Sequence, residues 1–284
     1  LKRDVDLNVH GLFDTMICAQ LLGEERIGLA DLLNKYFNVE LDKKYQKADW
    51  SQRPLPAEMI RYAAADTNYL HRLMDLFIER LKTLGRMSWV AEECGLLEEV
   101  RFADNNGPLC VRFKGAGTLS RRELGVLECL LQWREGEGAR LDRPVYKILG
   151  NKTLLELAQR MPQEKNGLRG IEGLPPRLVE RFAGPLLAAV ARGRKIPEEE
   201  LPIFPRQPRK LRDPAREDRF KVLKKWREKE AARYALDPGV LINNFALDAL
   251  AQANPQSAAE LDRFSGLKTW QKAELGEGLL GALT

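Results

Sequence analysis

Tyr62 and Asp66 are the residues of this chain whose types and spacing could do chemistry. They stand four positions apart, with three alanines between them. In a helix this spacing puts both side chains on one face, one turn apart, beside residues small enough to admit another polymer. A carboxylate can bind a hard divalent cation and a phenol can position a water, so the pair suits metal-assisted phosphodiester cleavage. Because chance also places such pairs on exposed helix faces, the spacing alone is a weak signal.

The pair needs a helix, and residues 57–84 predict one. Neither glycine nor proline interrupts this stretch, and alanine, which dominates the motif, is the strongest helix former. We expect the helix to break near Asn68 and to end at Gly85. Its first apolar stripe consists of Ile60, Ala64 and Thr67.

Further elements are predicted on both sides of the motif helix. Residues 1–11 predict a loop leading to a short strand, and residues 13–22 and 29–37 predict helices. Asp14 stands at the start of the first helix, where a carboxylate can accept bonds from free backbone N–H groups. Residues 87–102 predict another helical run, which we expect to act as a connector.

The residues around the pair carry a longer pattern. Residues 41–43 read Leu-Asp-Lys, residues 48–55 read Ala-Asp-Trp-Ser-Gln-Arg-Pro-Leu, and residues 62–70 read Tyr-Ala-Ala-Ala-Asp-Thr-Asn-Tyr-Leu. In this order and spacing they resemble the third exonuclease motif of ribonuclease D. Residues 13–23, from Phe-Asp-Thr to Leu-Leu-Gly, resemble an earlier part of the same family.

The resemblance implies a 3′→5′ exonuclease that uses four carboxylates and a tyrosine. It implies that Asp66 is a metal ligand and that Tyr62 orients the water, with two divalent cations, Mg²⁺ or Mn²⁺, in a complete site. The family's first motif, an Asp-x-Glu on a core strand, is absent from these residues, as is its second-motif Asp. We therefore expect a fragment of a longer protein that holds one of the four carboxylates and is inactive by itself.

The loop at residues 41–55 carries cations that could hold a substrate. Lys47 and Arg53 lie beside the motif, and phosphate contacts dominate affinity for nucleic acids. A solvated loop is the plain alternative. Trp50 is either a plug beneath the loop or a stacking platform for a base, and we favour the plug.

The second half of the chain contains an internal repeat with a shift of 93 positions. Trp133 aligns with Trp226, and the Arg-Glu that follows each Trp aligns as well. A helical module therefore occurs twice, and each copy resembles the HRDC module that helicases share with ribonuclease D. We expect the two Trp side chains to anchor the module cores. Helices are expected in the first copy at about 121–136, 144–149, 152–160, 166–171 and 175–191.

Positive charge concentrates on the spacer between the two copies and on the first helix of the second copy. Residues 194–216 are rich in proline, which favours an extended spacer over a helix. Residues 206–233 hold twelve Lys or Arg against five Asp or Glu, whereas the whole chain has a net charge of only +5. We infer a polyanion-binding surface rather than an ordinary solvated helix face. The candidate contacts are Arg209, Lys210, Arg212, Lys221, Lys224 and Lys225.

These features predict a mainly α chain. It would comprise the helical C-terminal part of an α/β ribonuclease H-like exonuclease domain, followed by two all-α HRDC modules. The expected divisions are the exonuclease part at 1–86, a connector at 87–117, the first module at 118–194, a basic linker at 195–215 and the second module at 216–284.

Composition argues against other classes of protein. The four cysteines are far apart and include no Cys-x-x-Cys, so we expect neither a zinc site nor a disulfide framework, and we expect a reducing cytoplasm. No apolar run approaches the roughly 18 residues that predict a membrane-spanning helix. The sequence pI of about 9.0 favours a polyanionic partner.

The leading hypothesis is a ribonuclease D-like enzyme that trims the 3′ ends of structured RNA such as tRNA precursors, as a monomer. Two alternatives stay open. The first is a non-catalytic nucleic-acid-binding adaptor, because the missing carboxylates would leave binding alone. The second is a 3′→5′ DNA exonuclease attached to helicase-type modules.

Overall fold

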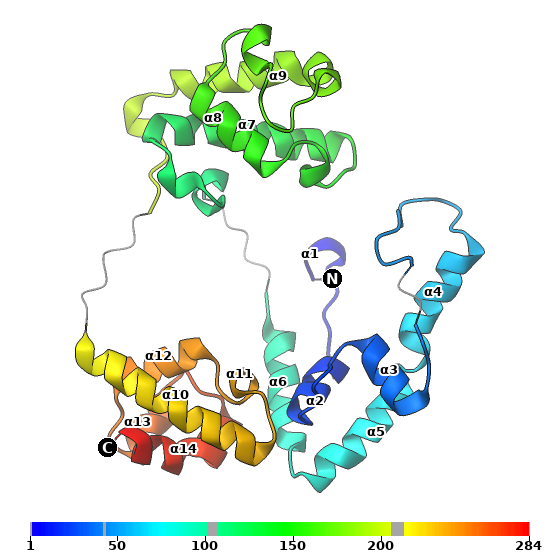
Figure 1. Cartoon of the computed structure of the whole chain (residues 1–284), viewed down its shortest axis with the longest axis vertical. Helices are drawn as coiled ribbons and strands as arrows, with labels where there is room; N and C mark the ends of the chain where they lie inside the picture. The colour runs from blue at the N-terminus through cyan, green and yellow to red at the C-terminus, as the bar shows by residue number, and fades with distance from the viewer. Residues whose placement is uncertain (1, 42–43, 102–106, 206–212, 284) are drawn as a thin grey trace. The chain divides into compact units, whose positions relative to one another are not determined.

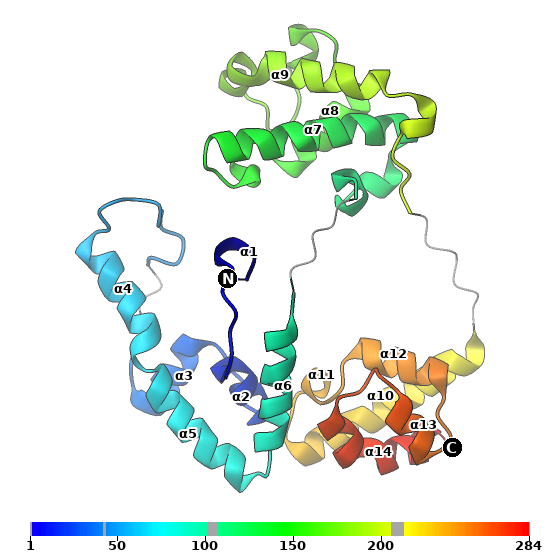
Figure 2. The same ribbon diagram turned by 180° about the vertical axis from the view of Figure 1, so that it is seen from behind.

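The computed structural model describes residues 2–41, 44–101, 107–205 and 213–283. The chain divides into two compact units (Figures 1 and 2). Unit 1 joins residues 1–102 to residues 211–284, and unit 2 comprises residues 103–210. Every regular element within the described ranges is helical, which confirms the prediction of a mainly α chain. No helix in these ranges has both the length and the apolar surface that a bilayer span requires.

The first part of unit 1 follows the sequence prediction closely. Asp14 caps its second helix as predicted, because the carboxylate accepts bonds from the N–H groups of Met16 at 2.8 Å and Ile17 at 3.1 Å. The motif helix breaks at Tyr69, next to the expected position. The described helices of this part are α1 (Lys2–Val5), α2 (Thr15–Leu21), α3 (Leu29–Phe37), α4 (Ala57–Asn68), α5 (Leu70–Thr83) and α6 (Met87–Glu99).

The strand expected near the start of the chain is wrong. Residues 2–5 form α1, and the described residues 6–14 form no strand. A strand is stabilised by pairing its backbone with another strand, and none of the described segments forms a strand with which it could pair.

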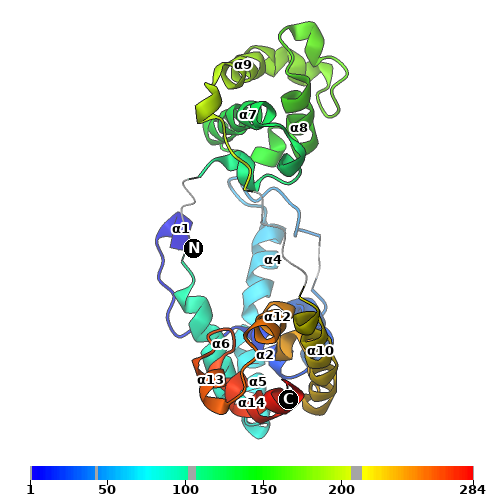
Figure 3. The ribbon, with the colours of Figure 1, turned by 90° about the vertical axis from the view of Figure 1, so that its left-hand side faces the viewer.

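The last part of unit 1 folds onto the first part, so that both share one apolar core. The core buries Leu73 and Phe77 from α5 together with Leu223, Leu247 and Trp270. Figure 3 shows α14 beside α6. The described helices of this last part are α10 (Pro214–Tyr234), α11 (Pro238–Leu241), α12 (Asn244–Ala253), α13 (Ala258–Arg263) and α14 (Thr269–Leu283).

The helix α6 forms the junction between the two parts. Its Trp89 stacks on Trp270 with ring centroids 4.3 Å apart and an interplanar angle of 14°. The Glu92 carboxylate accepts bonds from the N–H groups of Thr269 at 2.6 Å and Trp270 at 3.0 Å. These N–H groups begin α14, where a negative charge is favoured. The first part of the expected connector, α6, is therefore part of the core of unit 1, whereas Cys110 and Ala116 from its later part are buried in the core of unit 2.

A buried arginine also links the first and last parts of unit 1. Arg86, at 7% exposure, donates to the carbonyl oxygens of Leu21 at 2.7 Å and Tyr234 at 2.6 Å, so it ties the end of α2 to the end of α10. Gly23 adopts φ +76°, and a Cβ atom there would lie 2.1 Å from the carbonyl oxygen of Ala235. Glycine is required at this position by both the backbone conformation and the close approach.

Unit 2 is built on two antiparallel long helices, α7 (Arg121–Arg140) and α9 (Pro176–Lys195), with α8 (Asn151–Arg160) packed on α7 (Figure 1). Ser120 and Glu123 form a capping box at the start of α7. Short 3₁₀ turns complete the described part of unit 2, at η1 (Leu109–Arg112), η2 (Ala116–Thr118), η3 (Val145–Lys147), η4 (Lys165–Leu168) and η5 (Glu198–Glu200).

The repeat is visible in the bonds of one arginine per copy. Arg134 Nη1 donates to the carbonyl of Leu149 at 3.1 Å and to Asn151 Oδ1 at 2.8 Å. Arg227 makes the same two bonds, at 2.7 and 2.9 Å, with the aligned carbonyl and Asn side chain. In both copies Nε is buried and finds no acceptor among the described residues. Burial lowers the pKa of Arg134, although the guanidinium stays charged.

The two Trp side chains differ from the expected core anchors. Trp133 and Trp226 are half-buried and pack against the edges of their cores, and Trp133 meets Phe182 edge-on at 5.4 Å. The neighbouring arginine takes the buried position because its head satisfies carbonyl and amide oxygens that would otherwise lose their bonds on burial. The sequence analysis missed this role, although Arg134 and Arg227 align in the repeat.

We predict that Arg134→Met lowers the free energy of unfolding of unit 2 by about 3 kcal/mol, because a buried carbonyl and amide lose a charged donor. Urea unfolding followed by circular dichroism would measure the change. Arg177→Met is the matched control, since Arg177 is exposed on α9 and has no ion-pair partner among the described residues. Equal stabilities for the two variants would contradict the assignment.

Candidate active site

Tyr62 and Asp66 line one pocket beside α4. The cavity has a volume of about 330 Å³, and both side chains are half-buried. Tyr62 and Asp66 thus line the same cavity, as two residues that act on one substrate must do. The full lining consists of Glu40, Leu41, Lys44, Tyr45, Glu58, Arg61, Tyr62, Ala65 and Asp66.

The Tyr62 ring packs against two aromatic residues of the preceding loop. Its centroid is 6.0 Å from that of Tyr45 and 5.9 Å from that of Trp50. Trp50 is half-buried, and its Nε1–H donates to the carbonyl of Tyr45 at 3.1 Å, as expected for a plug beneath the loop. The sequence analysis did not single out Tyr45, because one aromatic residue in a polar loop gives no signal of its partner.

The opposite face of α4 is open within the described structure. The stripe of Ile60, Ala64 and Thr67 is exposed, and Ile60 reaches 55%. Met59 is the one buried residue of α4.

The described residues do not form a complete cation site. None of the described residues belongs to a group of three or more His, Cys, Asp or Glu that could hold a metal ion. Mg²⁺ requires near-octahedral oxygen coordination, and Asp66 can fill only part of it. Glu58 also lines the pocket, but its carboxylate pairs with Arg61 at 3.8 Å. A bound cation would therefore need further ligands from outside this set.

The two cationic side chains of the loop that are proposed to contact nucleic acid differ in how many of their donors are already bonded within the protein. Arg53 Nη1 donates to the carbonyl oxygens of Trp50 at 2.9 Å and Gln52 at 2.6 Å, so part of its guanidinium is used within the loop. Lys47 is exposed and has no ion-pair partner among the described residues. Lys47 can therefore offer a free ammonium, and Arg53 part of a guanidinium, to a phosphate.

The helix α10 carries the rest of the described cationic candidates. Lys221 pairs with Asp218 at 2.8 Å, whereas Lys224 and Lys225 are exposed without an ion-pair partner among the described residues. Unpaired, exposed ammonium groups on one helix are available to phosphates. The candidates that lie outside the described residues are Arg209, Lys210 and Arg212.

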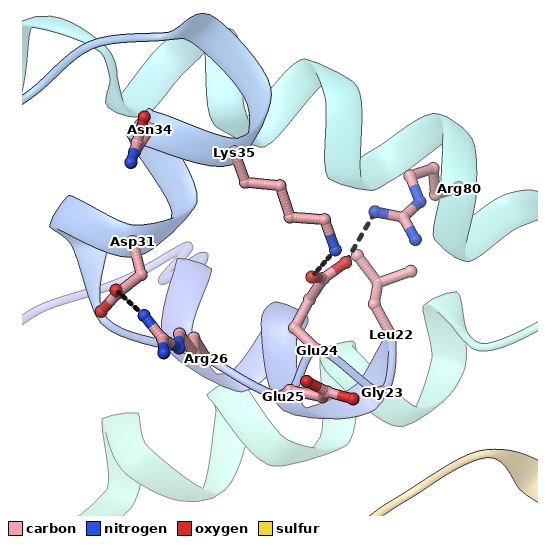
Figure 4. Close-up of a pocket in the computed structure, with 9 residues that line it drawn as sticks. All are labelled: Leu22, Gly23, Glu24, Glu25, Arg26, Asp31, Asn34, Lys35 and Arg80. Atoms are coloured by element: carbon pink, nitrogen blue, oxygen red, sulfur yellow. Dashed lines mark hydrogen bonds and ion pairs between the residues drawn. The ribbon is translucent and has the colours of Figure 1, made fainter.

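A second pocket, of about 540 Å³, lies at the turn between α2 and α3 (Figure 4). The Glu24 side chain is 3% exposed and pairs with Lys35 and, at 2.8 Å, with Arg80. Arg26 pairs with Asp31 at 3.4 Å. Each cation of this pocket thus already faces a carboxylate, so the network fastens the turn to α5 rather than attracting an anion.

Two protein-family models match separate segments of the chain. A model described as 3′-5′ exonuclease matches residues 1–82, which include the pocket of Tyr62 and Asp66. A model described as HRDC domain matches residues 123–190 and 216–283. The two HRDC matches contain the two copies of the repeat.

Two curated relatives are named ribonuclease D. The protein of Gluconacetobacter diazotrophicus is 35% identical over 194 residues, which cover 67% of this chain and 49% of the relative. That of Granulibacter bethesdensis is 30% identical over 273 residues, which cover 95% of this chain and 67% of the relative. The chain thus matches about half of the first relative's length and two thirds of the second's.

A solved structure shares the fold. It is that of Escherichia coli RNase D, titled an exoribonuclease involved in structured RNA processing. The match has a TM-score of 0.68 and 22% identity, and it covers 99% of this chain and 75% of that one. At this identity the likeness shows the fold alone.

The Glu24 network yields a prediction about pH and stability. Burial acts to raise the pKa of Glu24, but the bonds from Lys35, Tyr36 and Arg80 outweigh it and hold the pKa below the usual 4.5. A carboxyl whose pKa is depressed by folding contributes stability above its unfolded pKa and loses it as pH falls through the folded pKa. We expect Glu24→Gln to cost about 1–3 kcal/mol at pH 7, and less as the pH falls below about 4.5.

Thermal melts of unit 1 from pH 7 to pH 3 would test this expectation. Glu79→Gln on α5 is the control, because Glu79 is exposed and pairs only with the neighbouring Lys82 among the described residues. A constant difference between wild type and Glu24→Gln across this range would contradict the ionic origin of the stabilisation.

Proposed function

This chain belongs to the ribonuclease D family, and on that premise we propose that the protein carrying it is a metal-dependent 3′→5′ exoribonuclease. The observation that supports this most directly is the shared pocket of Tyr62 and Asp66 inside the segment matched by the 3′-5′ exonuclease model. The proposed substrate is the 3′ end of structured RNA, with tRNA precursors as the expected class. The proposed compartment is the cytoplasm, since all four cysteines are free thiols.

The proposed roles follow from the chemistry of the two side chains. Asp66 would bind a divalent cation together with carboxylates that these residues do not supply, and the Tyr62 hydroxyl would orient the attacking water. Divalent cations, Mg²⁺ or Mn²⁺ and two in a complete site, would activate water and neutralise phosphate charge. Because the chain supplies one such ligand, we propose that residues 1–284 alone do not hydrolyse RNA.

The proposed RNA contacts lie in two places. Lys47 and Arg53 would hold the substrate backbone beside the pocket. On α10, the ammonium groups of Lys221, Lys224 and Lys225 would bind the body of the RNA through its phosphates. The further contacts proposed from the sequence are Arg209, Lys210 and Arg212.

We also propose a division of labour along the chain. The exonuclease part ends at about residue 86, and the modules at 118–194 and 216–284 bring RNA to it. The expected connector at 87–117 does not separate the exonuclease part from the last module, because α6 belongs to the core that they share. In this proposal the basic linker at 195–215 lies between the two modules, and the protein acts as a monomer.

A non-catalytic adaptor is the second candidate function. Its supporting observation is that Asp66 has no group of further metal ligands around it among the described residues. An adaptor would bind RNA without degrading it. Incubation of the full-length protein with labelled RNA and with single-stranded DNA would separate the adaptor, the ribonuclease and a DNA exonuclease.

We predict that Asp66→Asn abolishes exonuclease activity in the full-length protein, lowering kcat by at least about 10³-fold in Mg²⁺ or Mn²⁺. The amide keeps the shape of the side chain but removes the charge that binds a hard cation. The measurement is the release of nucleotides from a 3′ single-stranded RNA tail. Asp75→Asn on α5 is the control, and undiminished hydrolysis by Asp66→Asn would remove Asp66 from the mechanism.

We predict that Lys224→Glu combined with Lys225→Glu weakens RNA binding by residues 1–284 and flattens its dependence on salt. Each lost phosphate contact on a single strand lowers the slope of log K against log salt by about 0.7. Fluorescence anisotropy at several salt concentrations would measure this. The control is Lys82→Glu with Lys114→Glu, two equal charge changes outside α10, and an equal effect of both pairs would show that only net charge matters.

A further inference from the structure

The orientation of the Tyr62 ring depends on the loop that precedes α4. Met59 is the one buried residue of α4, and Tyr62 is half-buried. The Tyr62 ring instead meets Tyr45 at 6.0 Å, with an angle of 65° between the planes, and Trp50 at 5.9 Å, with an angle of 46°. Aromatic pairs at these separations favour defined relative orientations.

The two flanking rings form one linked pair. Trp50 Nε1–H donates to the backbone carbonyl of Tyr45 at 3.1 Å, which fixes the loop segment that carries both rings. Arg53 donates to the carbonyl of Trp50 at 2.9 Å and so restrains the same segment from its other end. Tyr45 also lines the pocket with Tyr62 and Asp66, so the restraint lies beside the reacting groups.

We propose that Tyr45 and Trp50 are positioning residues, which clamp the Tyr62 ring so that its hydroxyl stays aimed into the pocket shared with Asp66. This inference rests on the proposed function, because it gives Tyr62 a role in the reaction. A phenol that packs against two other rings has fewer accessible rotamers than a phenol on a bare helix face. Small displacements of a positioned group carry large costs in rate, on the order of 10²-fold for about 1 Å.

The proposed clamp uses different groups of Tyr45 and Trp50. Tyr45 contributes its ring and its backbone carbonyl, so Tyr45→Phe should recover most of the kcat that Tyr45→Ala loses. Trp50 contributes its ring and its N–H, so Trp50→Phe should recover part of the loss caused by Trp50→Ala. A residue that merely filled space under the loop would show neither a selective loss of kcat nor this graded recovery.

The test is a double-mutant cycle in the full-length protein, with kcat and KM measured on a 3′ single-stranded RNA tail. Trp50→Ala and Tyr45→Ala are each made in the wild-type and Tyr62→Phe backgrounds. We expect kcat to fall about 10- to 100-fold in the wild-type background, with KM changed by less than about twofold. In the Tyr62→Phe background we expect no further fall, because the hydroxyl to be positioned is already gone.

The outcomes separate the clamp from the proposed function. Equal falls in both backgrounds would overturn the clamp while leaving the exonuclease intact. An unchanged kcat for Tyr62→Phe would remove Tyr62 from the reaction and overturn the clamp with it. Phe245→Ala is the control for loss of a large ring, since Phe245 is 82% exposed on α12. If Trp50→Ala fails to fold, Trp50→Phe and Tyr45→Ala complete the same cycle.

Discussion

The stack of Trp89 on Trp270 is the interaction on which unit 1 depends. The two indoles come from residues 181 positions apart in the sequence, have ring centroids 4.3 Å apart and are each less than 5% exposed. Burying large aromatic surfaces against each other contributes both hydrophobic stabilisation and a preferred geometry. Glu92 adds a charge at the start of α14, and Arg86 bridges the ends of α2 and α10. The last module is thereby a structural component of the unit that carries the exonuclease segment.

The candidate site is stabilised by different contacts from those of the core of unit 1. The core fixes α5, but α4 continues beyond it with Met59 as its buried residue. The pocket of Tyr62 and Asp66 therefore takes its shape from short-range contacts with the loop that contains Tyr45 and Trp50. A rigid frame combined with a locally held site is a common arrangement in enzymes, because substrate loops must be positioned by a stable scaffold.

The two copies of the repeat share internal hydrogen bonds but pack in different surroundings. Arg134 and Arg227 make matching bonds, so the same backbone turn is stabilised in each copy. In unit 2 the long helices α7 and α9 complete a core of their own. In unit 1 the second copy completes a core with residues from the start of the chain. Two similar sequences thus fold into one module with its own core and one module that shares its core with the first part of the chain.

The sequence by itself determined most of the helices and the common helix face of Tyr62 and Asp66. Helix propensity, the cap at Asp14 and the four-residue spacing of Tyr62 and Asp66 act within a few turns, so short-range rules were sufficient to predict them. Only the tertiary structure decided that α6 is a core helix, that arginines rather than tryptophans fill the buried position of each repeat, and that Tyr45 faces Tyr62. These features depend on contacts between residues distant in sequence or across a loop, and local patterns carry no record of which partner such a side chain meets.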